Sequence, residues 1–128
     1  MSQQFYRRHA EEFFKATVGV DMSPIRERFL DGLKPQAHIL DAGCGSGRDA
    51  KAFFDAGFQV SAFDASTELA ALASEYCGFQ VAVRRFEEVT EFERYDGIWC
   101  CASLLHVPGE DLPGVLSKLW RALRPGGR

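Results

Sequence analysis

The sequence has little of what marks several broad classes of protein. Its 15 basic and 18 acidic residues give a net charge of −3, so it has no excess of Lys and Arg to neutralise nucleic-acid phosphates. No window approaches the roughly 18 consecutive apolar residues of a membrane-spanning helix, and the N-terminus lacks the apolar segment of a signal peptide. We therefore expect a cytoplasmic protein that binds neither nucleic acid nor membrane.

Cysteine and histidine are also sparse. The four cysteines include no C-x-x-C pair and the three histidines are scattered, so we expect neither a metal site nor a disulfide framework. The chain does have 128 residues, of which 46% are hydrophobic, and this is enough to fill one core. The sequence therefore predicts a single domain over residues 1–128.

Helical and strand patterns alternate along the chain. Short apolar runs predict strands at 37–42, 58–64, 79–84 and 95–102. Helical spacing predicts inward-facing residues in five groups: Tyr6, Ala10, Phe13 and Phe14; Ile25, Phe29 and Leu33; Ala50, Phe53 and Phe54; Leu69, Leu72, Ala73 and Tyr76; and Leu112, Leu116, Leu119, Trp120 and Leu123. This alternation predicts an α/β fold, a doubly wound parallel sheet with helices on both faces and right-handed crossovers.

The chain ends in "LRPGGR", in which Pro125 ends a helix and two glycines make a turn. Such a turn normally leads into another strand, so we expect the C-terminal strands of the sheet to be missing from this sequence. The strand at 95–102 would then lie at an apolar edge, where a second copy of the chain could pair to form a homodimer.

A glycine-rich loop, "ILDAGCGSGRDA" at 39–50, follows the first predicted strand. In an open parallel sheet, ligands bind beyond the carboxyl ends of the strands, and glycines there allow a ligand to approach the backbone closely. A dinucleotide fingerprint, G-x-G-x-x-G, would place its third glycine at position 48, which is Arg48. An oxidoreductase that uses a dinucleotide is therefore disfavoured.

Two aspartates define the expected ligand further. Asp41 lies two residues before the first glycine, where its carboxylate would repel a pyrophosphate and attract an ammonium group. Asp64 ends the second predicted strand, about twenty residues beyond the loop, where an acidic side chain can accept both hydroxyls of a ribose. Ammonium, ribose and no phosphate together describe S-adenosylmethionine.

These segments resemble a known family. "ILDAGCGSGRDA" is similar to the first motif of class I S-adenosylmethionine-dependent methyltransferases, "FDAS" (63–66) to their acidic motif and "YDGIWCCASLLHVP" (95–108) to their fourth motif. Within the family, "LLHVP" and an N-terminal tyrosine resemble small-molecule enzymes of types 11, 12 and 25, including tellurite-resistance-type enzymes. The resemblance implies a Rossmann-like core over 35–128, truncated before strand five, under an N-terminal helical lid over 1–34.

The resemblance also implies a set of cofactor-binding residues: Tyr6, Asp41, Ala42, Gly43, Gly45, Asp64, Ala65, Phe86, Glu87, Cys101 and Ala102. In this assignment Asp41 binds the ammonium group of the methionine and Asp64 binds the ribose, and residues 65, 86 and 87 flank the adenine. Residues 101 and 102 lie near the transferred methyl group, and the tyrosine covers the cofactor.

His106 is the one candidate for a catalytic base, although a histidine after Ser-Leu-Leu also suits a helix cap. The segment after the fourth strand does not resemble the matching segment of nucleic-acid methyltransferases. Enzymes that methylate amino groups of DNA, and many that act on RNA, have Asp or Asn followed by Pro-Pro and an aromatic residue there, and cytosine C5 enzymes have a Pro-Cys nucleophile. We therefore expect an enzyme that methylates a small-molecule acceptor. The alternative is a catalytically inactive module that binds S-adenosylmethionine.

Overall fold

The computed structural model describes residues 3–101 and 103–128, apart from the side chains of Gln3, Tyr6 and His106. Four parallel strands form one sheet in the order β3-β2-β1-β4: β1 (His38–Ala42), β2 (Gln59–Asp64), β3 (Ala82–Val83) and β4 (Gly97–Trp99). The helices are α1 (Gln3–Thr17), α2 (Ser23–Leu30), α3 (Arg48–Asp55), α4 (Thr67–Cys77) and α5 (Leu112–Ala122), with single turns η1 (Phe86–Glu88) and η2 (Leu104–His106). The predicted α/β fold with a parallel sheet is confirmed.

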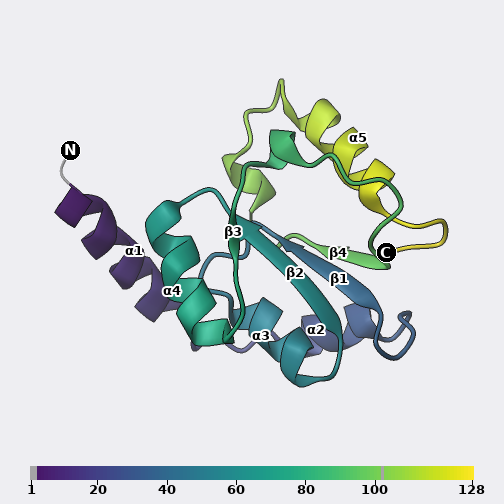
Figure 1. The fold of residues 1–128 in the computed structure, drawn as a ribbon, viewed down its shortest axis with the longest axis horizontal. Helices are drawn as coiled ribbons and strands as arrows, with labels where there is room; N and C mark the ends of the chain where they lie inside the picture. The colour runs from purple at the N-terminus through teal and green to yellow at the C-terminus, as the bar shows by residue number, and fades with distance from the viewer. Residues whose placement is uncertain (1–2, 102) are drawn as a thin grey trace.

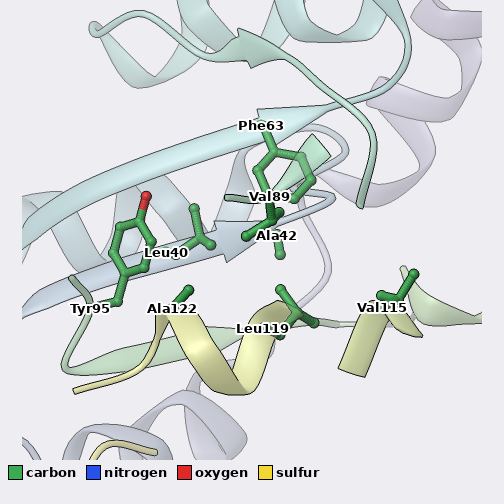
Figure 2. Packing of buried hydrophobic residues seen from close by; sticks show 8 residues of the cluster. All are labelled: Leu40, Ala42, Phe63, Val89, Tyr95, Val115, Leu119 and Ala122. Carbon is green, nitrogen blue, oxygen red and sulfur yellow. The ribbon is translucent and has the colours of Figure 1, made fainter. Parts of the chain in front are cut away.

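Alternate residues of the central strands enter different cores, because successive side chains of a strand point to opposite faces. On one face Leu40 and Ala42 pack against the inner side of α5 (Figure 2). On the other face Ile39 packs with Phe53 and Trp99, and α2 adds Phe29 to this aromatic group. Figure 1 shows the result, with α5 on one side of the sheet and α2 and α3 on the other.

The caps of α4 are a serine and a glycine, as the sequence pattern predicts, whereas α2 begins one residue earlier than its Ser-Pro pair predicts. Ser66 caps α4 by accepting a hydrogen bond from the backbone of Leu69 at 3.1 Å, and Gly78 ends it in the left-handed conformation. The pair Ser23-Pro24 predicts Ser23 as the N-cap of α2, but Ser23 is the first residue of the helix and Met22 is the cap. Asp21 accepts hydrogen bonds from both the backbone N–H (2.9 Å) and the hydroxyl (2.6 Å) of Ser23.

The predicted buried faces need correction at all five helices; Phe13 of α1 and Tyr76 of α4, for example, are exposed. On α5, Leu116 and Trp120 are exposed, and Val115 and Ala122 are buried together with the predicted Leu119. The end of this helix is joined to the start of the β4 segment, because the backbone N–H of Tyr95 donates to the carbonyl of Ala122 at 3.0 Å. Ile25 of α2 and Phe54 of α3 are also exposed, although Phe54 still packs on the ring of Phe79.

The outer strands are shorter than predicted. β3 covers only two residues, since the backbone of Val81 donates to the hydroxyl of Ser74 at 2.8 Å instead of to a strand. β4 ends at Trp99, and the chain then turns toward the carboxyl end of the sheet. The outer edge of β4 is partly occupied: Arg128 donates to the carbonyl of Asp96, and Ile98 donates to that of Arg128, both at 3.0 Å. The edge is thus less open than the homodimer prediction assumes, and the homodimer stays a prediction.

Candidate functional site

A cavity of about 1360 Å³ lies at the carboxyl ends of the strands. It is the place where the crossovers of an open parallel sheet diverge, and ligands of such sheets bind there. The glycine-rich loop forms its floor, and α1, η1, η2 and the start of α5 contribute to its walls. The cavity therefore combines segments from both ends of the chain.

The glycine-rich loop is held against β2. The backbone N–H groups of Gly43 and Cys44 both donate to the carbonyl of Phe63, at 3.0 and 2.9 Å. Gly43 has a φ of +73°, and a Cβ at this position would lie 2.5 Å from the Cβ of Ser103 and 3.3 Å from the ring of Phe86. A larger residue would therefore strain the backbone and push apart two walls of the cavity.

Asp64 connects the loop to the next helix. One of its carboxylate oxygens accepts from the backbone of Gly45 and the other from that of Ser66, each at 3.0 Å. Each oxygen keeps lone-pair capacity for one more donor, and the residue lines the cavity. The carboxylate is thus both fixed in place and able to accept two hydroxyl groups from a ligand.

Asp41 is the least satisfied polar group in the described part of the chain. It is 2% exposed, and its Oδ2 is the one buried side-chain oxygen or nitrogen there that lacks a hydrogen-bond partner. Burial raises the pKa of its carboxyl well above the usual range, and the charges of Asp49 and Asp64 raise it further. Since Asp41 lines the cavity, a cationic ligand would supply the missing partner.

A second buried carboxylate, Asp49, is fully paired. Arg26 donates to it at 2.7 Å, Trp99 at 2.9 Å, and Arg48 makes two contacts at 3.1 and 2.9 Å. Although burial opposes ionisation, these hydrogen bonds keep the pKa of Asp49 below its ordinary value. The two neighbouring aspartates therefore differ sharply, and only Asp41 has an oxygen left for a ligand.

Burial disfavours the thiolate form of Cys44, Cys77 and Cys100. Burial raises the pKa of Cys100 to about 12 and that of Cys77 to about 11, and it raises the pKa of Cys44 still further. A thiol must ionise to act as a nucleophile. These three residues therefore serve as small packing groups.

Comparison with known proteins identifies the family. A family model described as "Methyltransferase domain" matches residues 39–127. The ubiquinone biosynthesis O-methyltransferase of Xanthomonas axonopodis pv. citri is 32% identical over 116 residues, which are 84% of this chain and 48% of that protein. The chain belongs to the S-adenosylmethionine-dependent methyltransferases.

Solved structures of methyltransferases share the fold. A TehB-like SAM-dependent methyltransferase from Corynebacterium glutamicum has a TM-score of 0.79 at 22% identity, covering 98% of this chain and 71% of that one. The 1,6-didemethyltoxoflavin-N1-methyltransferase of Burkholderia thailandensis, solved with S-adenosylhomocysteine, has a TM-score of 0.72 at 26% identity, covering 96% and 58%. The cofactor of this methyltransferase family is S-adenosylmethionine.

The chain spans about half the length of the curated methyltransferases that it matches, from 35% to 48% of each. Within the described residues, the methyltransferase domain has no helix that is long and apolar enough to cross a membrane.

Most of the expected cofactor residues of this methyltransferase domain meet at the cavity. Its lining includes eight of them: Asp41, Gly43, Gly45, Asp64, Ala65, Phe86, Glu87 and Cys101. Ala42 differs, because it is not among the residues that line the cavity: its side chain is buried in the core beneath α5, and its carbonyl accepts a hydrogen bond from the hydroxyl of Ser103 at 2.7 Å. Ala102 and the side chains of Tyr6 and His106 lie outside the described residues.

The sequence analysis missed several residues that shape the methyltransferase site. Phe13 of α1 lies 3.2 Å from where a Cβ of Gly45 would be, so it covers the loop. Ser103 supports Gly43, and Arg48 was read only as the residue that interrupts a dinucleotide fingerprint. Of these residues, Phe13 had a signal in the sequence, since it belongs to the apolar face of its helix. Ser103 and Arg48 had none, because their contacts join distant parts of the chain.

Proposed function

We propose that this domain binds S-adenosylmethionine and transfers its methyl group to a small-molecule acceptor. The observation that carries the proposal is the unpartnered oxygen of Asp41, buried at one end of a cavity whose floor also presents Asp64. A ligand with an ammonium group at one end and a ribose beyond it matches both carboxylates. When bound, S-adenosylmethionine supplies an electrophilic methyl group on a positively charged sulfur.

The cavity walls suit the rest of the cofactor. The ring of Phe86 lies edge-on to Phe63 at 5.5 Å between centroids, so it is held rigidly where a base can stack. Glu87 and Ala65 lie on the same wall, and the amine of Lys118 fixes the backbone by donating to the carbonyl of Glu87 at 2.5 Å. Residues 65, 86 and 87 would therefore hold the adenine.

Positioning supplies most of the catalysis in this proposal. Holding two reactants in line is worth up to about 7 to 11 kcal/mol, and excluding water strengthens each polar contact in the site. Cys101, Leu105 and Val107 line the cavity near Asp41 and η2 and provide an apolar wall there. His106 stays the candidate base for an acceptor that must lose a proton.

An oxygen acceptor is favoured by the name of the Xanthomonas relative, which is an O-methyltransferase. For this chain we propose only the chemical class of the acceptor, which is a hydroxyl or carboxyl group of a small molecule. The competing function, an inactive module that binds the cofactor, has the same Asp41 and Asp64. Methyl transfer to a panel of phenols and carboxylates separates the two.

The first experiment is calorimetric titration with S-adenosylhomocysteine, with NAD as the control ligand. We expect micromolar binding of S-adenosylhomocysteine alone. Asp64→Ala should weaken it by about 1 to 3 kcal/mol, the cost of losing hydrogen bonds to a charged group. Asp64→Asn keeps one acceptor oxygen and should lose less.

Asp55→Ala is the matched control, since it removes a carboxylate from an exposed pair with Lys51 that does not line the cavity. It should bind like the unmodified chain. Equal affinity in the Asp64→Ala variant, or tighter binding of NAD, would contradict the proposed site.

A further inference from the structure

We propose that Arg48 is a positioning residue for methyl transfer, and that its guanidinium clamps the end of α1 and Cys101 together beside the methionine end of the cofactor site. This inference rests on the proposed function. Besides its neighbour Asp49, Arg48 contacts two segments that are distant in the sequence, the end of α1 and the residues after β4.

The contacts of Arg48 define the clamp. Nε and one terminal nitrogen hold Asp49 at 3.1 and 2.9 Å. The other terminal nitrogen donates to the backbone carbonyl of Thr17 at 3.2 Å, and the guanidinium also contacts the Sγ of Cys101 at 3.6 Å. Thr17 ends α1 and Cys101 follows β4, so one side chain joins two walls of the cavity across the sequence.

Arg48 is built to hold protein groups and not a ligand. Its four contacts engage all but one of the N–H groups of a guanidinium, and Asp49, which it shares with Arg26, balances part of its charge. The side chain is only 16% exposed. An anionic acceptor would therefore gain little from it, whereas removing it would release both walls.

The remaining contacts of α1 leave room for such a clamp. Phe14 meets the ring of Tyr76 edge-on at 5.6 Å, which holds the middle of the helix against α4. The carbonyl of Thr17 belongs to the last turn of α1, where backbone carbonyls have no partner within the helix. Apart from Arg48, the backbone N–H of Val20, just beyond the helix, donates to it at 3.2 Å. Arg48 therefore supplies a tertiary partner for the end of α1 that faces the cavity.

The fold itself does not depend on this clamp. Without Arg48, the buried carboxylate of Asp49 keeps its hydrogen bonds from Arg26 and Trp99. These two contacts still join α2 and β4 to the start of α3. A substitution of Arg48 can therefore change the site and leave the core folded.

The test compares Arg48→Lys and Arg48→Met with Lys51→Met by titration with S-adenosylhomocysteine. A lysine keeps the positive charge, but its single ammonium group cannot reach the three groups that the planar guanidinium contacts. We expect both Arg48 variants to bind about tenfold more weakly, as the loss of one or two hydrogen bonds predicts. Because the buried carboxylate of Asp49 also loses two hydrogen bonds, their melting temperatures should fall, and the titration is made below the transition of each variant, where both are folded. Lys51→Met removes an exposed charge one turn along the same helix and should bind normally.

Hydrogen exchange gives a second measurement, made on the unmodified chain and on the Arg48→Lys variant. Binding of S-adenosylhomocysteine should slow exchange of the backbone amides at 17–22, and the Arg48→Lys variant should lose this protection. The clamp is overturned if the lysine variant binds as tightly as the unmodified chain, or if bound ligand leaves exchange at 17–22 unchanged. A different result, no binding by the unmodified chain, would instead overturn the proposed function.

Discussion

At the scale of single residues, the buried carboxyl group of Asp41 affects the free energy of unfolding as well as ligand binding. A carboxyl group with a raised pKa in the folded state contributes stability that is fully present only below its unfolded pKa and is lost as pH rises through its folded pKa. At neutral pH the buried carboxyl group of Asp41 therefore lowers the free energy of unfolding. The consequence can be measured by replacing the carboxyl group with an amide of the same shape.

We predict that Asp41→Asn raises the free energy of unfolding at neutral pH by about 1 to 3 kcal/mol, because the amide does not have to ionise in a buried place. The gain should shrink as the pH is lowered toward the unfolded pKa of aspartate. Thermal unfolding between about pH 4 and pH 8 measures it. The same variant should lose affinity for S-adenosylhomocysteine, and a variant that binds normally would contradict the role of Asp41.

The sequence was enough to find Asp41 and Asp64 but not the residues that support them. Both aspartates end or nearly end a strand, so the parallel sheet alone brings them to one edge. Ser103 and Arg48 act through partners 61 and 53 positions away. No local pattern encodes such contacts, because they depend on how α1 and the segment after β4 return over the sheet.

At the scale of elements, α5 shows how an apolar pattern can fit two orientations of a helix. The sequence offers one face with Leu112, Leu116 and Trp120 and another with Leu119. The second face is the one buried against the sheet, together with Val115 and Ala122, and periodicity alone does not distinguish the two faces. Strand lengths were overestimated for a similar reason: β3 and β4 end where side chains or turns replace their ladder partners.

This orientation predicts unequal effects of two substitutions on α5. Leu119→Ala should lower the free energy of unfolding by about 2 to 5 kcal/mol, because it leaves a cavity beneath the helix. Trp120→Ala should change it by less than about 0.5 kcal/mol, because Trp120 is 75% exposed. Urea unfolding measures both. A larger loss from Trp120→Ala than from Leu119→Ala would show that the opposite face is buried.

At the scale of the whole molecule, the N-terminal helices share a core with the sheet. Phe29 of α2 lies 5.2 Å from Trp99 and 5.7 Å from Phe53, measured between ring centroids. We therefore predict one unfolding transition, with helix loss by circular dichroism coinciding with the change in tryptophan fluorescence. Phe29→Ala should separate the two signals. Two distinct transitions in the unmodified chain would mean that residues 1–34 fold independently of residues 35–128.

The strand order also has a consequence for synthesis. β1 and β2 leave the ribosome early, together with the glycine-rich loop, but β4 pairs with β1 and not with the strand made before it. Ser103, which supports the loop through the carbonyl of Ala42, is translated later still, followed by α5. A nascent chain thus carries the glycine-rich loop well before it has a pocket, and cofactor binding can stabilise the domain only after Ser103 and α5 have been made.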